Sequence, residues 1–221
     1  MKDPLKNNWP NLWKNLERAV RREMRTFPNS HGWDHVERVC ALALKIGEQE
    51  KADRTVLALA ALLHDIGRSE EQASKGKLCH AQIGAEKAER LLAPHPIPEP
   101  VRKAVLDCIR SHRFRGNRLP RSLEAKVLFD ADKLDSIGAV GIGRAFLFAG
   151  EVGAKLHNSQ KDLSTTASYS REDTAFREFR LKLIKVSDRM LTKTGKRLAR
   201  SRHAFMVHFF EELEAEVQGL K

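Results

Sequence analysis

Apolar positions recur along this chain every three or four residues, which is the period of an amphipathic helix. Val36, Val39, Ala43 and Ile46 keep this period after Asp34, which we predict to be a helix N-cap. Residues 56–63 are almost continuously apolar, as expected of a helix at the centre of a bundle. Further helical segments are predicted at 83–92, from Pro100 onward, at 125–134, at 137–148 and at 176–217, the last with Gly195 as a candidate break.

Three polar stretches, at 68–78, 113–122 and 151–173, are predicted to be loops. Strand-like alternation of apolar and polar residues never runs long enough to build a sheet. The sequence therefore predicts an all-α fold, a helical bundle.

Length and composition fit one globular domain. The chain has 221 residues, of which 41% are hydrophobic and 31% charged. It contains no apolar run of the roughly 18–20 residues that cross a bilayer, and its N-terminal residues lack the apolar stretch of a signal peptide. We therefore expect a cytoplasmic protein without a membrane partner. The 3 cysteines are widely spaced and predict reduced thiols.

The chain is strongly basic, with 40 Lys and Arg against 29 Asp and Glu, a net charge of +11. This balance favours anionic partners such as nucleotides or nucleic acid. Much of the excess lies in residues 177–202, which carry ten basic residues and two acids. That segment is either a solvated helical face or a surface for substrate or nucleic acid, and the sequence leaves both interpretations open.

Four metal-competent side chains interrupt apolar helical segments: His35, His64, Asp65 and Asp132. A buried carboxylate without a partner costs several kcal/mol, so acids in such places are usually paired or bound to a metal ion. Neighbouring residues of a helix point about 100° apart, so the His64–Asp65 doublet can share an ion only near a helix end, which we place at Gly67.

Two imidazoles and two carboxylates suit Mn²⁺, Fe, Co²⁺, Ni²⁺ or Zn²⁺ rather than Ca²⁺. We expect one divalent ion, with Mn²⁺ favoured and Mg²⁺ as a further candidate. Asp130 is the alternative to Asp132 as a ligand. With Asp132 as the ligand, Asp130 and Asp135 would orient the ligands or act as electrostatic partners at a helix N-terminus.

The motifs LLHDIGR, HAQIGAEKAERLL, IRSHR and VLFDADKLDSIGAVGIGRAF follow one another in this chain. In this order they resemble the HD-domain metal-dependent phosphohydrolases, and most closely the small bacterial HD hydrolases. The resemblance covers nearly the whole chain. It implies a single HD-type domain over residues 1–221, with a motif core at about 25–150 and C-terminal helices at about 174–218. It also implies metal ligands at His35, His64, Asp65 and Asp132.

Two departures from the family pattern stand out. Related nucleotidases carry an acid three positions after the doublet, where this chain has Arg68, so that acid–base role cannot be transferred; Glu70 and Glu71 lie nearby. Relatives that bind two metal ions typically contain a His-His pair. His80 and His112 occupy comparable positions here, but Arg113 follows where a second histidine would stand. We therefore predict one ion, with His80 and His112 facing the phosphate or donating a proton.

The predicted chemistry is hydrolysis of a phosphate or pyrophosphate bond of a nucleotide by metal-activated water. His64, Asp65 and Arg68 would be catalytic. Lys133 and Arg144, with His80 and His112, would contact the substrate. Each cation also has a structural interpretation: Arg68 near a helix end, Lys133 beside a neighbouring acid, and Arg144 in an ion pair. His31, which precedes His35 by four residues, is predicted to lie in a loop or to support the ligands.

Two alternative functions remain at this stage. One is a phosphodiesterase acting on cyclic nucleotides or RNA, although the missing His-His pair speaks against its two-metal form. The other is a non-catalytic module that binds nucleotides or nucleic acid, against which the retention of all four ligands argues. The sequence leaves the exact substrate, the physiological metal and the oligomeric state open.

Overall fold

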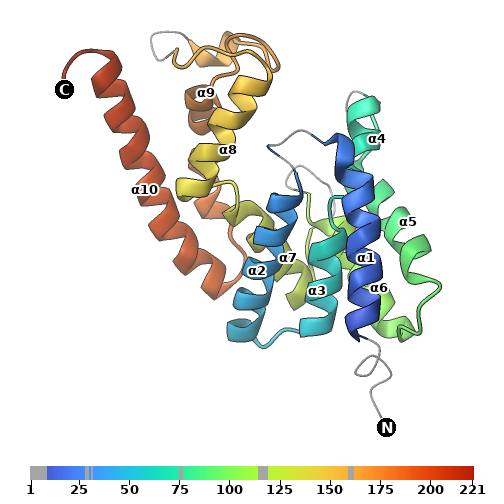
Figure 1. Cartoon of the computed structure of the whole chain (residues 1–221). Coiled ribbons are helices and arrows are strands. Elements are labelled where there is room, and N and C mark those ends of the chain that lie inside the picture. The colour runs from blue at the N-terminus through green and yellow to red at the C-terminus, as the bar shows by residue number, and fades with distance from the viewer. Residues whose placement is uncertain (1–8, 28–29, 31, 75–76, 114–118, 159–161) are drawn as a thin grey trace. The chain divides into compact units, whose positions relative to one another are not determined.

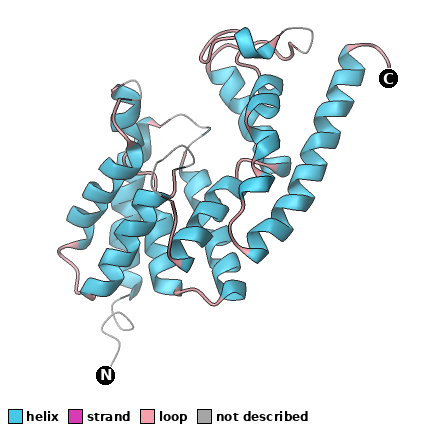
Figure 2. Cartoon of the chain, turned by 180° about the vertical axis from the view of Figure 1, so that it is seen from behind, coloured by secondary structure: helices cyan, strands magenta, loops and turns pink. Residues whose placement is uncertain are grey.

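The computed structural model describes residues 9–27, 30, 32–74, 77–113, 119–158 and 162–221, and these contain helices and turns but no strand (Figure 2). The predicted all-α fold is confirmed. The described residues fall into two compact units, one from Met1–Phe27 and His31–Ala131, the other from Pro28–Ser30 and Asp132–Lys221. The single domain expected over residues 1–221 stays a prediction. Within the described ranges, no helix is both long and apolar enough to span a membrane.

The first unit is a bundle of helices around α3 (Figure 1). Its helices are α1 (Trp9–Glu23), α2 (Trp33–Glu50), α3 (Arg54–Leu63), α4 (Arg68–Ala73), α5 (His80–Leu92), α6 (Glu99–Ser111) and the greater part of α7 (Leu123–Leu134). α3 packs against α1, α2, α5 and α6, and α5 also packs along α6. These contacts confirm the prediction that the apolar segment 56–63 lies at the centre of a bundle.

Helix α3 shows why the sequence folds in this way. Asp53 caps its N-terminus, since the carboxylate accepts hydrogen bonds from the backbone N–H groups of Thr55 and Val56 at 2.8 and 3.0 Å. Every residue from Val56 to Leu63 is buried. A helix that is apolar on all sides is stable only inside a bundle, because each face must contact another apolar surface. The residues that follow α3 are therefore placed in the interior.

Two local predictions for this unit were wrong. Gly32, not Asp34, is the N-cap of α2, and the Asp34 carboxylate instead accepts a hydrogen bond from Arg38 one turn later, at 2.7 Å. The stretch 68–78 was predicted to be a loop, but Arg68–Ala73 forms the short helix α4. None of the α4 residues is buried, so no apolar period marks the helix in the sequence.

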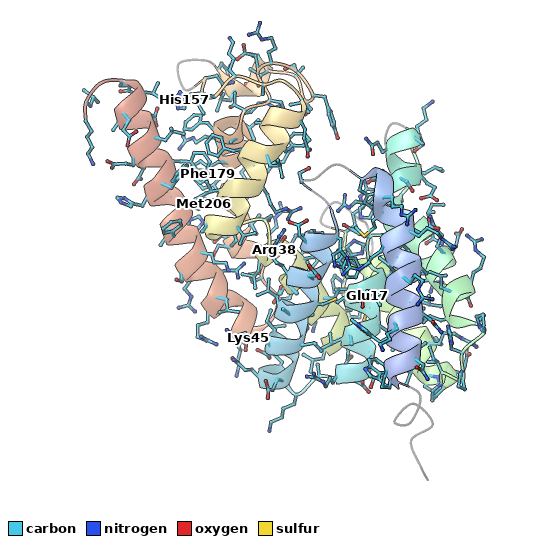
Figure 3. The ribbon with its side chains drawn as sticks, viewed as in Figure 1. Glu17, Arg38, Lys45, His157, Phe179 and Met206 are labelled. Atoms are coloured by element: carbon cyan, nitrogen blue, oxygen red, sulfur yellow. The ribbon has the colours of Figure 1, made fainter. Side chains whose placement is uncertain are left out.

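The second unit has an aromatic core formed by α8 (Gly138–Glu151), α9 (Ala175–Leu181) and α10 (Lys193–Val217). Phe210 of α10 is 1% exposed and stacks on Phe179 of α9 with 4.4 Å between ring centroids. Phe146 of α8 stacks on the same Phe210 at 6.2 Å. Figure 3 shows Phe179 and Met206 in this core. Aromatic pairs of this kind stabilise a small core by more than the burial of their apolar surface contributes alone.

The stretch 176–217 is interrupted, but not at Gly195. Helix α9 ends at Leu181, two 3₁₀ turns follow at Leu183–Lys185 and Ser187–Arg189, and α10 begins at Lys193. The Thr192 side chain caps α10 by accepting a hydrogen bond from the Gly195 backbone N–H at 2.9 Å. Gly195 therefore lies in the first turn of the last helix.

Candidate metal centre

His64 and His112 hold their rings in the same way. His64 follows the last residue of α3 and His112 follows the last residue of α6, so each is a helix C-cap. Carbonyl groups in the last turn of a helix lack an intrahelical partner. His64 Nδ1 donates to the Ala61 carbonyl at 2.7 Å, and His112 Nδ1 donates to the Ile109 carbonyl at 2.6 Å. Because a carbonyl only accepts, the proton of each neutral ring is on Nδ1 and the lone pair is on Nε2.

His80, the first residue of α5, has the same tautomer, but the acceptor beside its Nδ1 is a side chain. Its Nδ1 donates to Glu71 Oε2 at 2.8 Å, which leaves the lone pair on Nε2. Burial and the nearby positive charge of Arg68 lower the pKa of His80 to about 2, although Asp65 acts in the opposite direction. His80 is therefore neutral at ordinary pH.

The Nε2 atoms of these histidines point toward one another. His80 Nε2 lies 3.2 Å from His112 Nε2, and His64 Nε2 lies 3.3 Å from His35 Nε2. With the protons of His80 and His112 on Nδ1, two lone pairs face each other with no hydrogen atom between them. Two ligand atoms about 2.1 Å from one ion at right angles lie about 3.0 Å apart. The spacing therefore suits a cation better than it suits the two rings alone.

Asp65 lies between the two histidine pairs. Its Oδ2 atom is 3.5 Å from both His35 Nε2 and His64 Nε2. Its Oδ1 atom is 3.4 Å from His112 Nε2 and 3.7 Å from His80 Nε2. Oδ1 is buried and has no hydrogen-bond partner. An unsatisfied buried oxygen of this kind costs about 1–3 kcal/mol, and more when it is charged. A metal ion bound to Oδ1 would offset that cost.

Asp65 is ionised despite its burial. Burial raises the pKa of this carboxyl, but the Arg68 guanidinium holds the pKa well below its usual value. Arg68 Nε donates to Asp65 Oδ2 at 2.5 Å. The doublet does not end a helix at Gly67 as predicted: α3 ends at Leu63, before the doublet, and Gly67 is the N-cap of α4. The turn between the two helices is what allows both side chains to face inward.

Asp132 is the fourth predicted ligand, and it directly follows Ala131 in helix α7. One ligand atom each of His35, His64 and Asp132 lies within 4.8 Å of the other two, and all three residues are buried. Asp65, His80 and His112 form a second group of the same kind. Asp130 belongs to neither group, although it is also buried.

Both groups fit a divalent ion by the chemistry of their donors. Each contains two imidazole nitrogens and a carboxylate, the mixed set that Mn²⁺, Fe, Co²⁺, Ni²⁺ and Zn²⁺ prefer. The ring nitrogens of His64, His80 and His112 are already deprotonated on their inner side, as metal binding requires. His35, His64, His80 and His112 thus lie around the buried carboxylate of Asp65, and Asp132 groups with His35 and His64.

The other predicted substrate contacts have protein partners. Lys133 Nζ donates to Asp132 Oδ2 at 2.6 Å. Arg144 Nη1 donates to Asp135 Oδ2 at 3.0 Å, and Arg144 Nε donates to the Ser30 carbonyl at 3.0 Å. For these two cations the structure shows the carboxylate pairing that the sequence left open beside the substrate role. His31 lies outside the described residues.

The sequence alone gave no role to Glu71 and Arg113. Glu71 bonds to His80, and Arg113 Nη2 lies 2.9 Å from Glu71 Oε1. Glu71 stands in no recognisable motif, and Arg113 ends the IRSHR motif, where it was noted only as standing in place of a second histidine. The sequence signal was limited to an acid six residues after Asp65 and a base directly after His112.

A helical unit with buried His and Asp groups of this kind defines a metal-binding protein. Comparison with known proteins identifies its family. The HD domain family model matches residues 32–137. The uncharacterized protein YpgQ of Bacillus subtilis (strain 168) is 37% identical over 202 residues, which cover 87% of either chain.

Solved structures agree with this relationship. The crystal structure of Bacillus subtilis YpgQ in complex with ADP superimposes with a TM-score of 0.71 at 32% identity, covering 93% of this chain and 100% of that chain. An HD-superfamily hydrolase from Bacillus thuringiensis gives a TM-score of 0.72 at 28% identity, with 96% and 98% covered. The chain belongs to the HD-domain phosphohydrolase superfamily and is a metal-dependent hydrolase of that superfamily.

Proposed function

We propose that this hydrolase cleaves a phosphate or pyrophosphate bond of a nucleotide. The observation that carries the proposal is the convergence of inward-facing imidazole Nε2 atoms on the buried, ionised carboxylate of Asp65. The choice of a nucleotide is supported by the ADP complex of the related YpgQ and by the net charge of +11, which favours anionic substrates.

We propose His35, His64, Asp65 and Asp132 as the ligands of one divalent ion, with Mn²⁺ favoured. When bound, such an ion polarises a phosphoryl oxygen and lowers the pKa of a coordinated water molecule. The protein's own contribution is to bury these groups away from bulk water: all four side chains are at most 7% exposed. Ligands held by packed helices keep their geometry better than ligands on loops.

His80 and His112 have two interpretations in this proposal. As neutral rings with a lone pair on Nε2, they can accept a proton, or they can accept a hydrogen bond from a protonated phosphate oxygen. Alternatively, together with Asp65 they can hold a second ion. The prediction of one ion rested on Arg113 standing where a second histidine was expected, but the structure forms a histidine pair from two different helices. This pair favours the phosphodiesterase alternative more than the sequence did.

Arg68 is the proposed cation at the reacting phosphate. Its guanidinium is bonded to Asp65, and its side chain is 25% exposed, so it lies between the buried carboxylate and solvent. A guanidinium in this place can offset the charge that develops on the phosphoryl oxygens. Lys133 and Arg144 already pair with Asp132 and Asp135, so a phosphate would have to compete with a carboxylate for either of them.

The test is release of phosphate or pyrophosphate from a panel of nucleoside mono-, di- and triphosphates with Mn²⁺, Mg²⁺, Co²⁺ or Ni²⁺. Cyclic nucleotides and a short RNA are included to detect phosphodiesterase activity. Asp65→Ala should abolish turnover, whereas Asp107→Ala, which removes an exposed acid from α6, should leave it unchanged. Turnover that persists in Asp65→Ala would refute the assigned site. Binding of nucleotide or RNA without turnover by the wild type would favour the non-catalytic module.

A further inference from the structure

Three side chains link α4, α5 and the end of α6 at the edge of the metal centre. Arg113 Nη2 lies 2.9 Å from Glu71 Oε1, and Glu71 Oε2 accepts the hydrogen bond of His80 Nδ1 at 2.8 Å. The side chains of Glu71 and Arg113 are 18% and 30% exposed, whereas that of His80 is 5% exposed. The link therefore runs from the surface to a buried ring.

His80 differs from His64 and His112 in what orients it. The rings of His64 and His112 bond to backbone carbonyls of their own helices, which cannot move without unfolding the helix end. His80 is the first residue of α5, and the carbonyl groups of a helix point toward its other end. Its Nδ1 therefore does not bond to a carbonyl of the preceding turn of α5 and instead donates to the Glu71 side chain.

The direction of this one hydrogen bond matters at the centre. With its proton on Nδ1, His80 turns the Nε2 lone pair toward Asp65 Oδ1 and His112 Nε2, at 3.7 and 3.2 Å. With the proton on Nε2, the same ring would donate to Asp65 or His112. A hydrogen atom would then stand where a metal ion or a substrate proton is needed.

We propose that Glu71, held in place by Arg113, is a positioning residue that selects the Nδ1–H tautomer of His80 and so keeps the His80 lone pair facing the metal centre. The proposal rests on the proposed function of that centre. Glu71 touches neither substrate nor ion in this role and acts through His80. For an ion that His80 holds together with Asp65 and His112, the general rule that an outer partner fixes the tautomer of a ligating histidine gives the expected size, a 10–100-fold effect on metal affinity.

Glu70 provides a matched control. It precedes Glu71 on the same short helix, but its carboxylate pairs with Lys87 at 2.7 Å rather than with a histidine. Glu70→Ala therefore removes an acid and an ion pair from α4 without touching His80. Glu71→Gln is the conservative variant, because its amide oxygen can still accept the Nδ1 proton while its charge is lost.

The first measurement is the tautomer of His80, from the ring ¹⁵N shifts of metal-free protein with ¹⁵N-labelled histidine, assigned by comparison with His80→Gln. We expect the Nδ1–H form in the wild type, Glu70→Ala and Glu71→Gln, and a mixture or the Nε2–H form in Glu71→Ala. The second measurement is calorimetry of Mn²⁺ binding: the affinity for an ion held by Asp65, His80 and His112 should fall 10–100-fold in Glu71→Ala and recover in Glu71→Gln. Arg113→Ala should give an intermediate loss.

An unchanged His80 tautomer in Glu71→Ala, or an equal loss of affinity in Glu70→Ala, would overturn the proposal. If Glu71→Ala does not fold, Arg113→Ala carries the test, and an unchanged tautomer in that variant counts against the proposal. Failure of the proposed function is a separate result: the wild type would release no phosphate from any nucleotide, while the tautomer and the metal affinity would still respond to Glu71.

Discussion

Gly67 and Gly84 pack backbone against backbone. A Cβ atom added to Gly67 would lie 2.5 Å from the Gly84 backbone nitrogen and 2.4 Å from the His80 carbonyl oxygen. No side chain fits at such distances, and the obstacle is backbone that cannot turn aside. This contact holds the turn that carries Asp65 against the N-terminal end of α5, which carries His80.

Gly67→Ala is therefore expected to destabilise the protein by about 1–3 kcal/mol, the usual cost of overpacking. It should also weaken metal binding, because the doublet turn and α5 must separate. Chemical unfolding of the metal-free protein measures the first effect. Gly143→Ala is the control: a Cβ at Gly143 in α8 would meet nothing within 4 Å, so the free energy of unfolding should rise by about 0.5–1 kcal/mol. Equal effects of the two changes would contradict the packing argument.

The lowered pKa of His80 makes stability depend on pH. The folded-state pKa is about 2, lowered by burial and then by Arg68, against 6.5 for the exposed side chain. Below pH 6.5 the unfolded chain binds a proton at His80 that the folded chain does not. This contribution to stability is therefore complete above pH 6.5 and is lost as the pH falls toward 2.

His80→Gln removes about one proton from the difference between the unfolded and folded chains. We therefore expect the pH slope of the free energy of unfolding to fall by about 1.4 kcal/mol per pH unit between pH 6 and 4.5. The measurement is urea unfolding of metal-free wild type and variant across that range. His208→Gln, which replaces an exposed histidine, should keep the wild-type slope. A variant slope that matches the wild type would show that His80 does not stay neutral in the fold.

Metal binding should stabilise the protein through Asp65. An ion that binds only the folded chain at 100 times its Kd adds about 2.7 kcal/mol, which raises the Tm of a protein of this size by roughly 5–10 °C. Asp65→Asn should abolish the shift, because the carboxylate next to both histidine pairs loses its charge. Asp107→Asn at the surface should not. A full Mn²⁺-induced shift in Asp65→Asn would place the ion elsewhere. Calorimetric stoichiometry in the same series distinguishes one bound ion from two.

Arg68 should affect both substrate turnover and the acid limb of the pH profile. Arg68→Ala removes the largest influence that lowers the pKa of Asp65, so this pKa should rise and activity should be lost at a higher pH on acidification. We also expect kcat/KM to fall about 100–1000-fold, the usual effect of losing one charge-stabilising donor. Arg68→Lys should recover part of this loss. Arg110→Ala, which breaks an exposed ion pair on α6, serves as the control. An unchanged pH profile in Arg68→Ala would show that Arg68 does not set the charge of Asp65.

Much of the fold can be inferred from the sequence because its signals are local. The apolar run at 56–63 predicts a buried helix, and the periodic segments at 83–92 and 125–134 correspond to α5 and α7. Proline also acts locally, since Pro100 lies in the first turn of α6 as predicted. His64 and Asp65 can also be recognised locally, because polar, metal-binding side chains are unusual directly after an apolar helix.

Helix α4 and the partners of His80 depend on contacts between distant parts of the chain. Glu71 and His80 are nine residues apart, and His80 and His112 are separated by 32, so no local period can show that they meet. The tautomer of each histidine follows from the acceptor that the fold places beside Nδ1. Hydrophobic periodicity can be read from the sequence because it depends on neighbouring residues, whereas the direction of a lone pair depends on atoms that only the folded backbone brings together.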